Sequence, residues 1–209
     1  MSSMIEAWGE PYVRENFAEA ARAFTNLVYR IPEDSWNGPG LGEWNLRSLV
    51  GHTSRSLLTV ETYLGRPADV DEVPTAAAYY VAIAETDHAA VAVRGVEAGQ
   101  ALGENPAEFV DALAQRVPQV DTAGDPLIMT AAGGMRLESY LSTRTVELVV
   151  HSLDIAAAVP RIEPPEFSDQ LLGEVARVAA TAAVLLGRGV ELLRAMTGRA
   201  TLSPGFSVV

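Results

Sequence analysis

Three side chains have the types and the spacing to bind one divalent metal ion. Glu147 and His151 are four residues apart, so on a helix they lie one above the other on the same face. His52 follows an apolar run that opens with Trp44 and Asn45, and a second helix there could present it to the same ion. Two imidazoles and one carboxylate are the usual protein ligands of a catalytic zinc, which keeps a fourth position for water or substrate.

The helix that carries Glu147 and His151 has a narrow polar line. At about 100° per residue, the polar side chains within about 40° of Glu147 are Tyr140, Thr143, His151 and Asp154. Arg144 lies about 60° away on the same wheel. Apolar residues border this line on both sides, which predicts that it faces a cavity rather than bulk water. Asp154, one turn beyond His151, could orient a ligating imidazole.

The same residues allow plainer interpretations. Arg144, Glu147 and Asp154 could form an ion-pair network on an exposed helix face. His52 could be a half-buried histidine with no ligand role. The third histidine, His88, lies among acidic neighbours, and we expect it to face solvent.

The donor set suits several metals, and zinc is the expected one. Nickel, manganese and iron are compatible with the same ligands. An open coordination position could bind a thiol as its thiolate. The chain has no cysteine, so a reactive thiol would have to come from a cofactor or a substrate.

Hydrophobic periodicity predicts long helices that would position these residues. A stripe that must be buried recurs at helical spacing in the first helix, at Val13, Phe17, Ala20, Phe24, Leu27, Val28 and Ile31. The helices are expected over residues 11–31, from Asn45 as N-cap to about 65, then 76–101, 106–117, 137–159 and 167–196. The connection over 118–135 contains a short extended piece at 127–129. These elements predict an all-α antiparallel bundle, as one domain over residues 1–209.

Composition restricts the partners. The chain has 48% hydrophobic residues and a formal net charge of −12, which suits one buried core and argues against nucleic acid or an anionic membrane. No signal peptide is evident in the first ten residues, and the longest apolar stretch, residues 178–186, is too short to span a bilayer. We therefore expect a cytoplasmic protein. A homodimer through exposed helix faces is compatible with this composition.

Two segments resemble the mycothiol-dependent maleylpyruvate isomerase family, a branch of the DinB-like superfamily of metal-binding helical bundles. They are WNLRSLVGH at residues 44–52 and YLSTRTVELVVHSLD at 140–154. Residues 193–199, LRAMTGR, resemble the end of the family's N-terminal domain. The resemblance implies an all-α, DinB-like antiparallel four-helix bundle with additional short helices. It also implies His52, Glu147 and His151 as metal ligands, and mycothiol as the thiol co-substrate.

The resemblance also implies an activity. A metal-held mycothiol thiolate would attack a small electrophile, giving thiol transfer or isomerisation, with Tyr140, Arg144 and Asp154 around the ligands. Full isomerases of the family carry a second, C-terminal domain that contributes to the active site, and this chain ends before one could form, so we expect a different electrophile. Two alternatives stay open. One is a metal-dependent hydrolase that uses bound water, and the other is a non-catalytic DinB-like binding protein.

Overall fold

The computed structural model describes residues 12–84, 88–116 and 124–208, and most of these residues are helical. In chain order the elements are α2 (Val13–Tyr29), the short 3-10 helix η2 (Glu33–Ser35), α3 (Leu46–Leu64), α4 (Ala76–Ile83), α5 (His88–Ala101), α6 (Pro106–Arg116), β1 (Leu127–Thr130), β2 (Gly133–Arg136), α7 (Leu137–Ala158), α8 (Asp169–Leu185) and α9 (Gly189–Met196). The predicted all-α class is confirmed.

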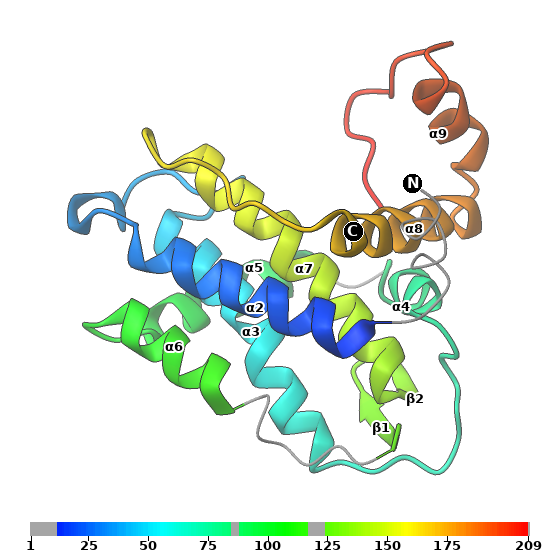
Figure 1. Ribbon diagram of the computed structural model, residues 1–209, viewed down its shortest axis with the longest axis horizontal. Helices are drawn as coiled ribbons and strands as arrows, with labels where there is room; N and C mark the ends of the chain where they lie inside the picture. The colour runs from blue at the N-terminus through cyan, green and yellow to red at the C-terminus, as the bar shows by residue number, and fades with distance from the viewer. Residues whose placement is uncertain (1–11, 85–87, 117–123, 209) are drawn as a thin grey trace.

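Helix α7 lies at the centre of the packing. It contacts α2, α3, α4 and α8, while α5 packs along α3, and α6 packs on α2 and α3. Figure 1 shows α2, α3 and α7 close together, with α8 and α9 at one side and α9 standing away from the bundle. Within the described residues, no helix is long and apolar enough to cross a membrane.

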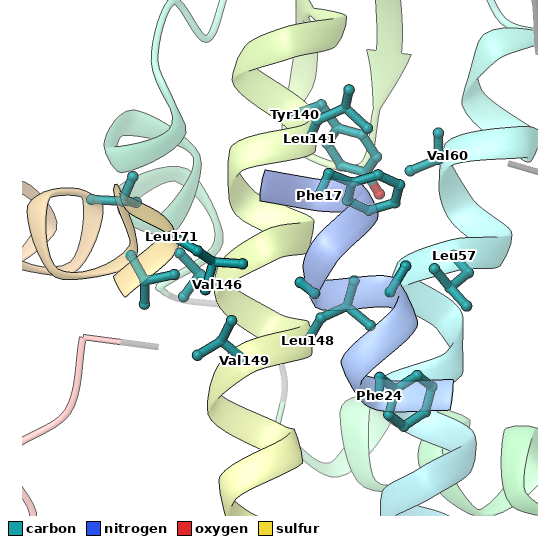
Figure 2. Close-up of a cluster of buried hydrophobic side chains, with 14 of the residues drawn as sticks. Phe17, Phe24, Leu57, Val60, Tyr140, Leu141, Val146, Leu148, Val149 and Leu171 are labelled. Carbon is teal, nitrogen blue, oxygen red and sulfur yellow. The ribbon is translucent and has the colours of Figure 1, made fainter. Parts of the chain in front are cut away.

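The core forms where α2, α3 and α7 face one another. Every residue of the predicted α2 stripe is buried, from Val13 to Ile31, as the periodicity required. Figure 2 shows Phe17 and Phe24 of α2 between α7 and the side of α3 that carries Leu57 and Val60. This shared core holds α3 and α7 side by side, and these are the two helices that carry the candidate ligands.

Local signals account for the start of α3. Asn45 has an extended backbone, and its side chain accepts a hydrogen bond of 2.8 Å from the backbone N–H of Ser48. This interaction satisfies one of the free donors of the first helical turn. The predicted N-cap is therefore confirmed, and the helix runs to Leu64 as expected.

The prediction of one helix over residues 76–101 is wrong. The structure has two helices, α4 and α5, and Ala84 forms the C-cap of α4. The two pack in different places, because α4 contacts α7 and α8 whereas α5 contacts α3. The sequence between them, ETD at residues 85–87, contains Thr and Asp, two residue types that favour helix N-caps. The apolar residues on either side obscured this signal.

The prediction of one helix over residues 167–196 is also wrong. Helix α8 ends at Leu185 and α9 begins at Gly189. Gly187 has a φ of +76°, its N–H donates to Val184, and the N–H of Arg188 donates to Ala183 at 2.7 Å. These two bonds form a Schellman motif, which ends a helix and favours glycine at the left-handed position.

The connection before α7 contains one more element than the sequence predicted. The extended piece at residues 127–129 is confirmed as β1, and β1 pairs antiparallel with β2 through Leu127↔Arg136 to Thr130↔Gly133. The hairpin leads directly into α7, which begins at Leu137 as predicted. Residues 117–123 of this connection lie outside the described residues.

Candidate metal centre

Helices α3 and α7 bring His52, Glu147 and His151 together. One ligand atom from each residue lies within 4.8 Å of the others. His52 comes from the middle of α3, and the other two come from successive turns of α7. The i, i+4 spacing aligns Glu147 with His151, and the packing of α3 against α7 supplies the third side chain.

The imidazole of His151 lies between two carboxylates of its own helix. Its Nε2 lies 3.3 Å from Oε2 of Glu147, and its Nδ1 lies 3.0 Å from Oδ2 of Asp154. Since Asp154 occupies Nδ1, the nitrogen near Glu147 is the one that faces the cluster. A carboxylate on the far nitrogen is the usual way in which proteins orient a metal-ligating histidine.

The second oxygen of Glu147 has a partner on α4. The hydroxyl of Tyr80 lies 3.1 Å from Oε1 of Glu147 and 3.0 Å from the carbonyl oxygen of Thr143, and it donates toward both. Tyr80 is fully buried, so its hydroxyl requires an internal acceptor. Tyr80 was not among the residues predicted from the sequence. Two adjacent tyrosines after three alanines were the available signal.

His52 has one ring nitrogen without a partner. Its Nδ1 is buried and has no hydrogen bond among the described residues. The ring centroids of Trp44 and His151 lie 4.6 Å and 5.2 Å from that of His52. Burial, with the charge of His151, lowers the pKa of His52 to about 4. A neutral imidazole fits a metal ligand, which must be deprotonated.

The pKa of Glu147 is lowered, and the pKa of His151 is raised. Burial alone would raise the pKa of Glu147, but the hydrogen bond from His151 and the charge of Arg144 hold it at about 2. Burial alone would lower the pKa of His151, but hydrogen bonds to Asp154 and Glu147 raise it to about 9. The donor set therefore contains one carboxylate, one neutral imidazole and one imidazole whose proton a cation must displace.

Residues 17–156 match the family described as mycothiol maleylpyruvate isomerase N-terminal domain. This range is well over half of the 209 residues and contains all three residues of the cluster. The chain belongs to the mycothiol maleylpyruvate isomerase N-terminal domain family. The helical fold is consistent with the DinB-like superfamily. Neither curated proteins nor solved structures returned a match.

In this member of the mycothiol maleylpyruvate isomerase family, Arg144 lies against aromatic rings. Its guanidinium carbon lies 5.2 Å and 4.9 Å from the ring centroids of Tyr79 and Tyr140, and its Nε donates to Thr143 at 3.0 Å. Burial alone would lower the pKa of Arg144, but the tyrosines and Glu147 raise it above its ordinary value. A permanent cation therefore lies beside Glu147, held by π-faces. The surface ion-pair alternative does not describe this arrangement.

The hydroxyl of Tyr140 points to α3 rather than to the cluster. It donates to Oγ1 of Thr59 at 2.7 Å, and burial raises its pKa above the ordinary value. Of the three residues predicted around the ligands, Asp154 is therefore the one that hydrogen-bonds a member of the cluster. On α7, Arg144 lies about one turn before Glu147 and Tyr140 about two turns before it.

The polar line on α7 becomes more exposed toward its C-terminal end. Tyr140 is 1% exposed, the side chains of Glu147 and His151 are 14% and 12% exposed, and that of Asp154 is 31% exposed. Among these four side chains, that of Asp154 is therefore the most accessible to solvent. The side chain of His88, at the start of α5, lies outside the described residues.

Proposed function

We propose that this protein is a divalent-metal-dependent enzyme that uses mycothiol to transfer a thiol to, or isomerise, a small electrophilic substrate. The observation that carries the proposal is the convergence of His52, Glu147 and His151 within 4.8 Å in a chain of the mycothiol maleylpyruvate isomerase N-terminal domain family. Zinc is the expected ion, since two imidazoles, one carboxylate and an open position form a common catalytic zinc set.

The ion would be held by His52, Glu147 and His151, with Nε2 of His151 as the facing nitrogen. When bound, a divalent cation supplies a position at which a thiol is held as thiolate at neutral pH. The protein has no cysteine, so its own side chains do not compete for that position. The thiol therefore has to arrive as a second small molecule, which agrees with the mycothiol of the family description.

The chain's other residues fix the donors and the local charge. Asp154 holds Nδ1 of His151 and so selects its tautomer. Tyr80 donates to one oxygen of Glu147 and leaves the other toward His151. Arg144 lowers the pKa of Glu147 and keeps it ionised. It also places positive charge about one helical turn from Glu147, where it would stabilise negative charge that develops on an attacked electrophile.

Metal content tests the ligand assignment. Protein purified without chelator should contain about one equivalent of metal per chain, and His52→Ala and His151→Ala should each reduce it to roughly a tenth or less, because two ligands do not complete the usual three-residue set. The matched control is His88→Ala, which removes the third histidine of the chain and should retain the metal. Stoichiometric metal in both ligand variants would contradict the proposal.

Thiol binding tests the second part of the proposal, the use of mycothiol. With cobalt in place of zinc, mycothiol should produce a sulfur-to-metal charge-transfer band in the wild-type protein, and His52→Ala should not show it. Turnover of candidate electrophiles should require the thiol. A cobalt spectrum unchanged by mycothiol, together with turnover in its absence, would instead indicate a hydrolase that uses bound water. An unchanged spectrum without any turnover would indicate a binding protein.

A further inference from the structure

Trp44 packs against the imidazole of His52. The two ring centroids are 4.6 Å apart, and the ring planes are inclined by 36°. Trp44 immediately precedes the N-cap of α3, and two backbone hydrogen bonds hold it there, from its N–H to Leu41 at 3.0 Å and from Gly40 to its carbonyl at 2.9 Å. The indole is therefore attached to a fixed part of the backbone.

Helix α5 holds the other side of the indole. Nε1 of Trp44 donates to the carbonyl oxygen of Ala92 at 3.0 Å. A Cβ on Gly95 would lie only 2.5 Å from two carbons of the indole ring, so the ring rests directly on the helix at a position without a side chain. His52, Trp44 and α5 thus form three successive layers.

Helix α5 is itself held firmly on α3. A Cβ on Gly51 would lie 2.2 Å from the backbone nitrogen of Gly99, so the two backbones approach as closely as glycine permits. At the end of α5, Nη1 of Arg47 donates to the carbonyl oxygen of Gly103 at 2.8 Å. Helix α5, against which the indole packs, is therefore held in a fixed position on α3.

The two histidines of the cluster differ in what orients them. His151 is oriented by a hydrogen bond from Nδ1 to Asp154 at 3.0 Å. Among the described residues, no hydrogen bond holds either ring nitrogen of His52, and its Nδ1 is buried without a partner. Ligating histidines ordinarily use this hydrogen bond to fix the ring, so the orientation of His52 must come from packing.

We propose that Trp44 is the positioning residue for His52. The indole, supported by Gly95 and the Ala92 carbonyl of α5, fixes the imidazole plane and does for His52 what Asp154 does for His151. As a statement about metal binding, the inference rests on the proposed function. As a statement about the ring of His52, it can be tested without metal.

Cobalt affinity and the cobalt absorption spectrum are the first readouts. Trp44→Leu should weaken cobalt binding about tenfold or more and shift the visible bands, because loss of an orienting neighbour typically costs about 10–100-fold. Trp44→Phe keeps an aromatic face and should recover most of the affinity. The matched control is Trp36→Leu, which removes a partly buried tryptophan of the same segment and should stay within about twofold of wild type.

Gly95→Ala tests the role of α5 through the same ring. The added methyl should displace the indole and weaken cobalt binding about fivefold or more. In the Trp44→Phe background the same change should have little effect, since the ring atoms that the methyl would meet are gone. Equal effects of Gly95→Ala in both backgrounds would contradict the layered arrangement.

Imidazole NMR signals of the metal-free protein test the role of Trp44 separately from the proposed metal centre. With only three histidines in the chain, the signals of His52 can be assigned with His52→Ala. Wild type should show one ordered ring with cross-relaxation to the indole, and Trp44→Leu should show an averaged, mobile ring. If wild type binds no cobalt, the proposed metal centre fails, while these signals still decide the role of Trp44. If the His52 ring in Trp44→Leu is as ordered as in wild type, and the cobalt spectrum is also that of wild type, the inference is overturned.

Discussion

At the scale of single residues, the cluster combines a partly buried carboxylate with an imidazole that would normally be neutral. The pKa of Glu147 is held at about 2 against its burial, and the pKa of His151 is raised to about 9 against its burial. Each shift depends on the other residue. The metal-free protein therefore holds a proton on His151 at neutral pH, and a cation has to displace it.

Metal affinity should consequently rise with pH. Between about pH 6.5 and 9 one proton leaves His151 for each ion bound, so the apparent affinity should increase about tenfold per pH unit and level off above pH 9. His52, with a pKa near 4, and Glu147 lose no proton in this range. Competition titrations at several pH values, with calorimetry in two buffers to count released protons, measure the slope. A flat profile between pH 7 and 8 would contradict the raised pKa of His151.

The stability of the metal-free protein should fall on both sides of neutrality. The folded-state pKa of His151 lies above its unfolded value of 6.5, so its contribution is complete below pH 6.5 and is lost as the pH rises through about 9. The pKa of His52 lies below its unfolded value, so its contribution is complete above pH 6.5 and is lost as the pH falls through about 4. Thermal unfolding at several pH values, in the presence of chelator, measures the loss of stability on both sides. His151→Gln should reduce the loss at alkaline pH and leave much of the loss at acid pH unchanged.

At the scale of elements, two interfaces hold the helices in register around the centre. The α3–α5 interface relies on the close approach of Gly51 and Gly99. Gly51→Ala should destabilise the protein by about 1–3 kcal/mol, because its Cβ would meet backbone atoms that cannot rotate away. Gly65→Ala, at the C-cap of α3, is the control. The nearest atom to its added Cβ would lie at 3.5 Å, so it should change stability by less than about 0.5 kcal/mol. Denaturant unfolding compares the two.

Helix α8 is joined to α2 and α7 through a buried carboxylate. Glu174 is 7% exposed and accepts hydrogen bonds of 2.5 Å from Asn16 and 2.6 Å from Ser142. Glu174→Ala leaves both donors buried without their acceptor and should destabilise the protein by roughly 2–4 kcal/mol in denaturant unfolding. Glu166→Ala, at an exposed position just before α8, should have almost no effect. Similar losses in the two variants would contradict this role of Glu174.

At the scale of the whole molecule, the candidate centre connects segments that are distant in the chain. A bound ion would join α3 to α7, so it stabilises the folded state over the unfolded one. At a free metal concentration of about 100 Kd this amounts to about 2.7 kcal/mol, or a rise in Tm of roughly 5–10 °C for a chain of this size. Thermal scans with zinc and with chelator measure the shift. His52→Ala should remove most of it, and an equal shift in that variant would place the ion elsewhere.

Predictions of the elements succeeded where the signal was local and failed where two helices follow each other closely. The α2 stripe, the Asn45 cap and the start of α7 all follow from spacing within a few turns. The end of α4 at Ile83 and the break at Gly187 were missed, because apolar residues continue on both sides of each. Gly187 and Gly189 carried a signal for the second break, which the long apolar run outweighed.

For the site, the sequence by itself determined that Glu147, His151 and Asp154 share one face of a helix, because helical periodicity fixes the relative direction of residues three and four apart. The family resemblance selected His52. Only the tertiary structure decided that His52 comes within 4.8 Å of the other two, that Tyr80 reaches Glu147 and that Trp44 packs on the His52 ring. These contacts depend on how α3, α4, α5 and α7 pack, and helix packing is set by side-chain interdigitation across the whole core rather than by any local spacing.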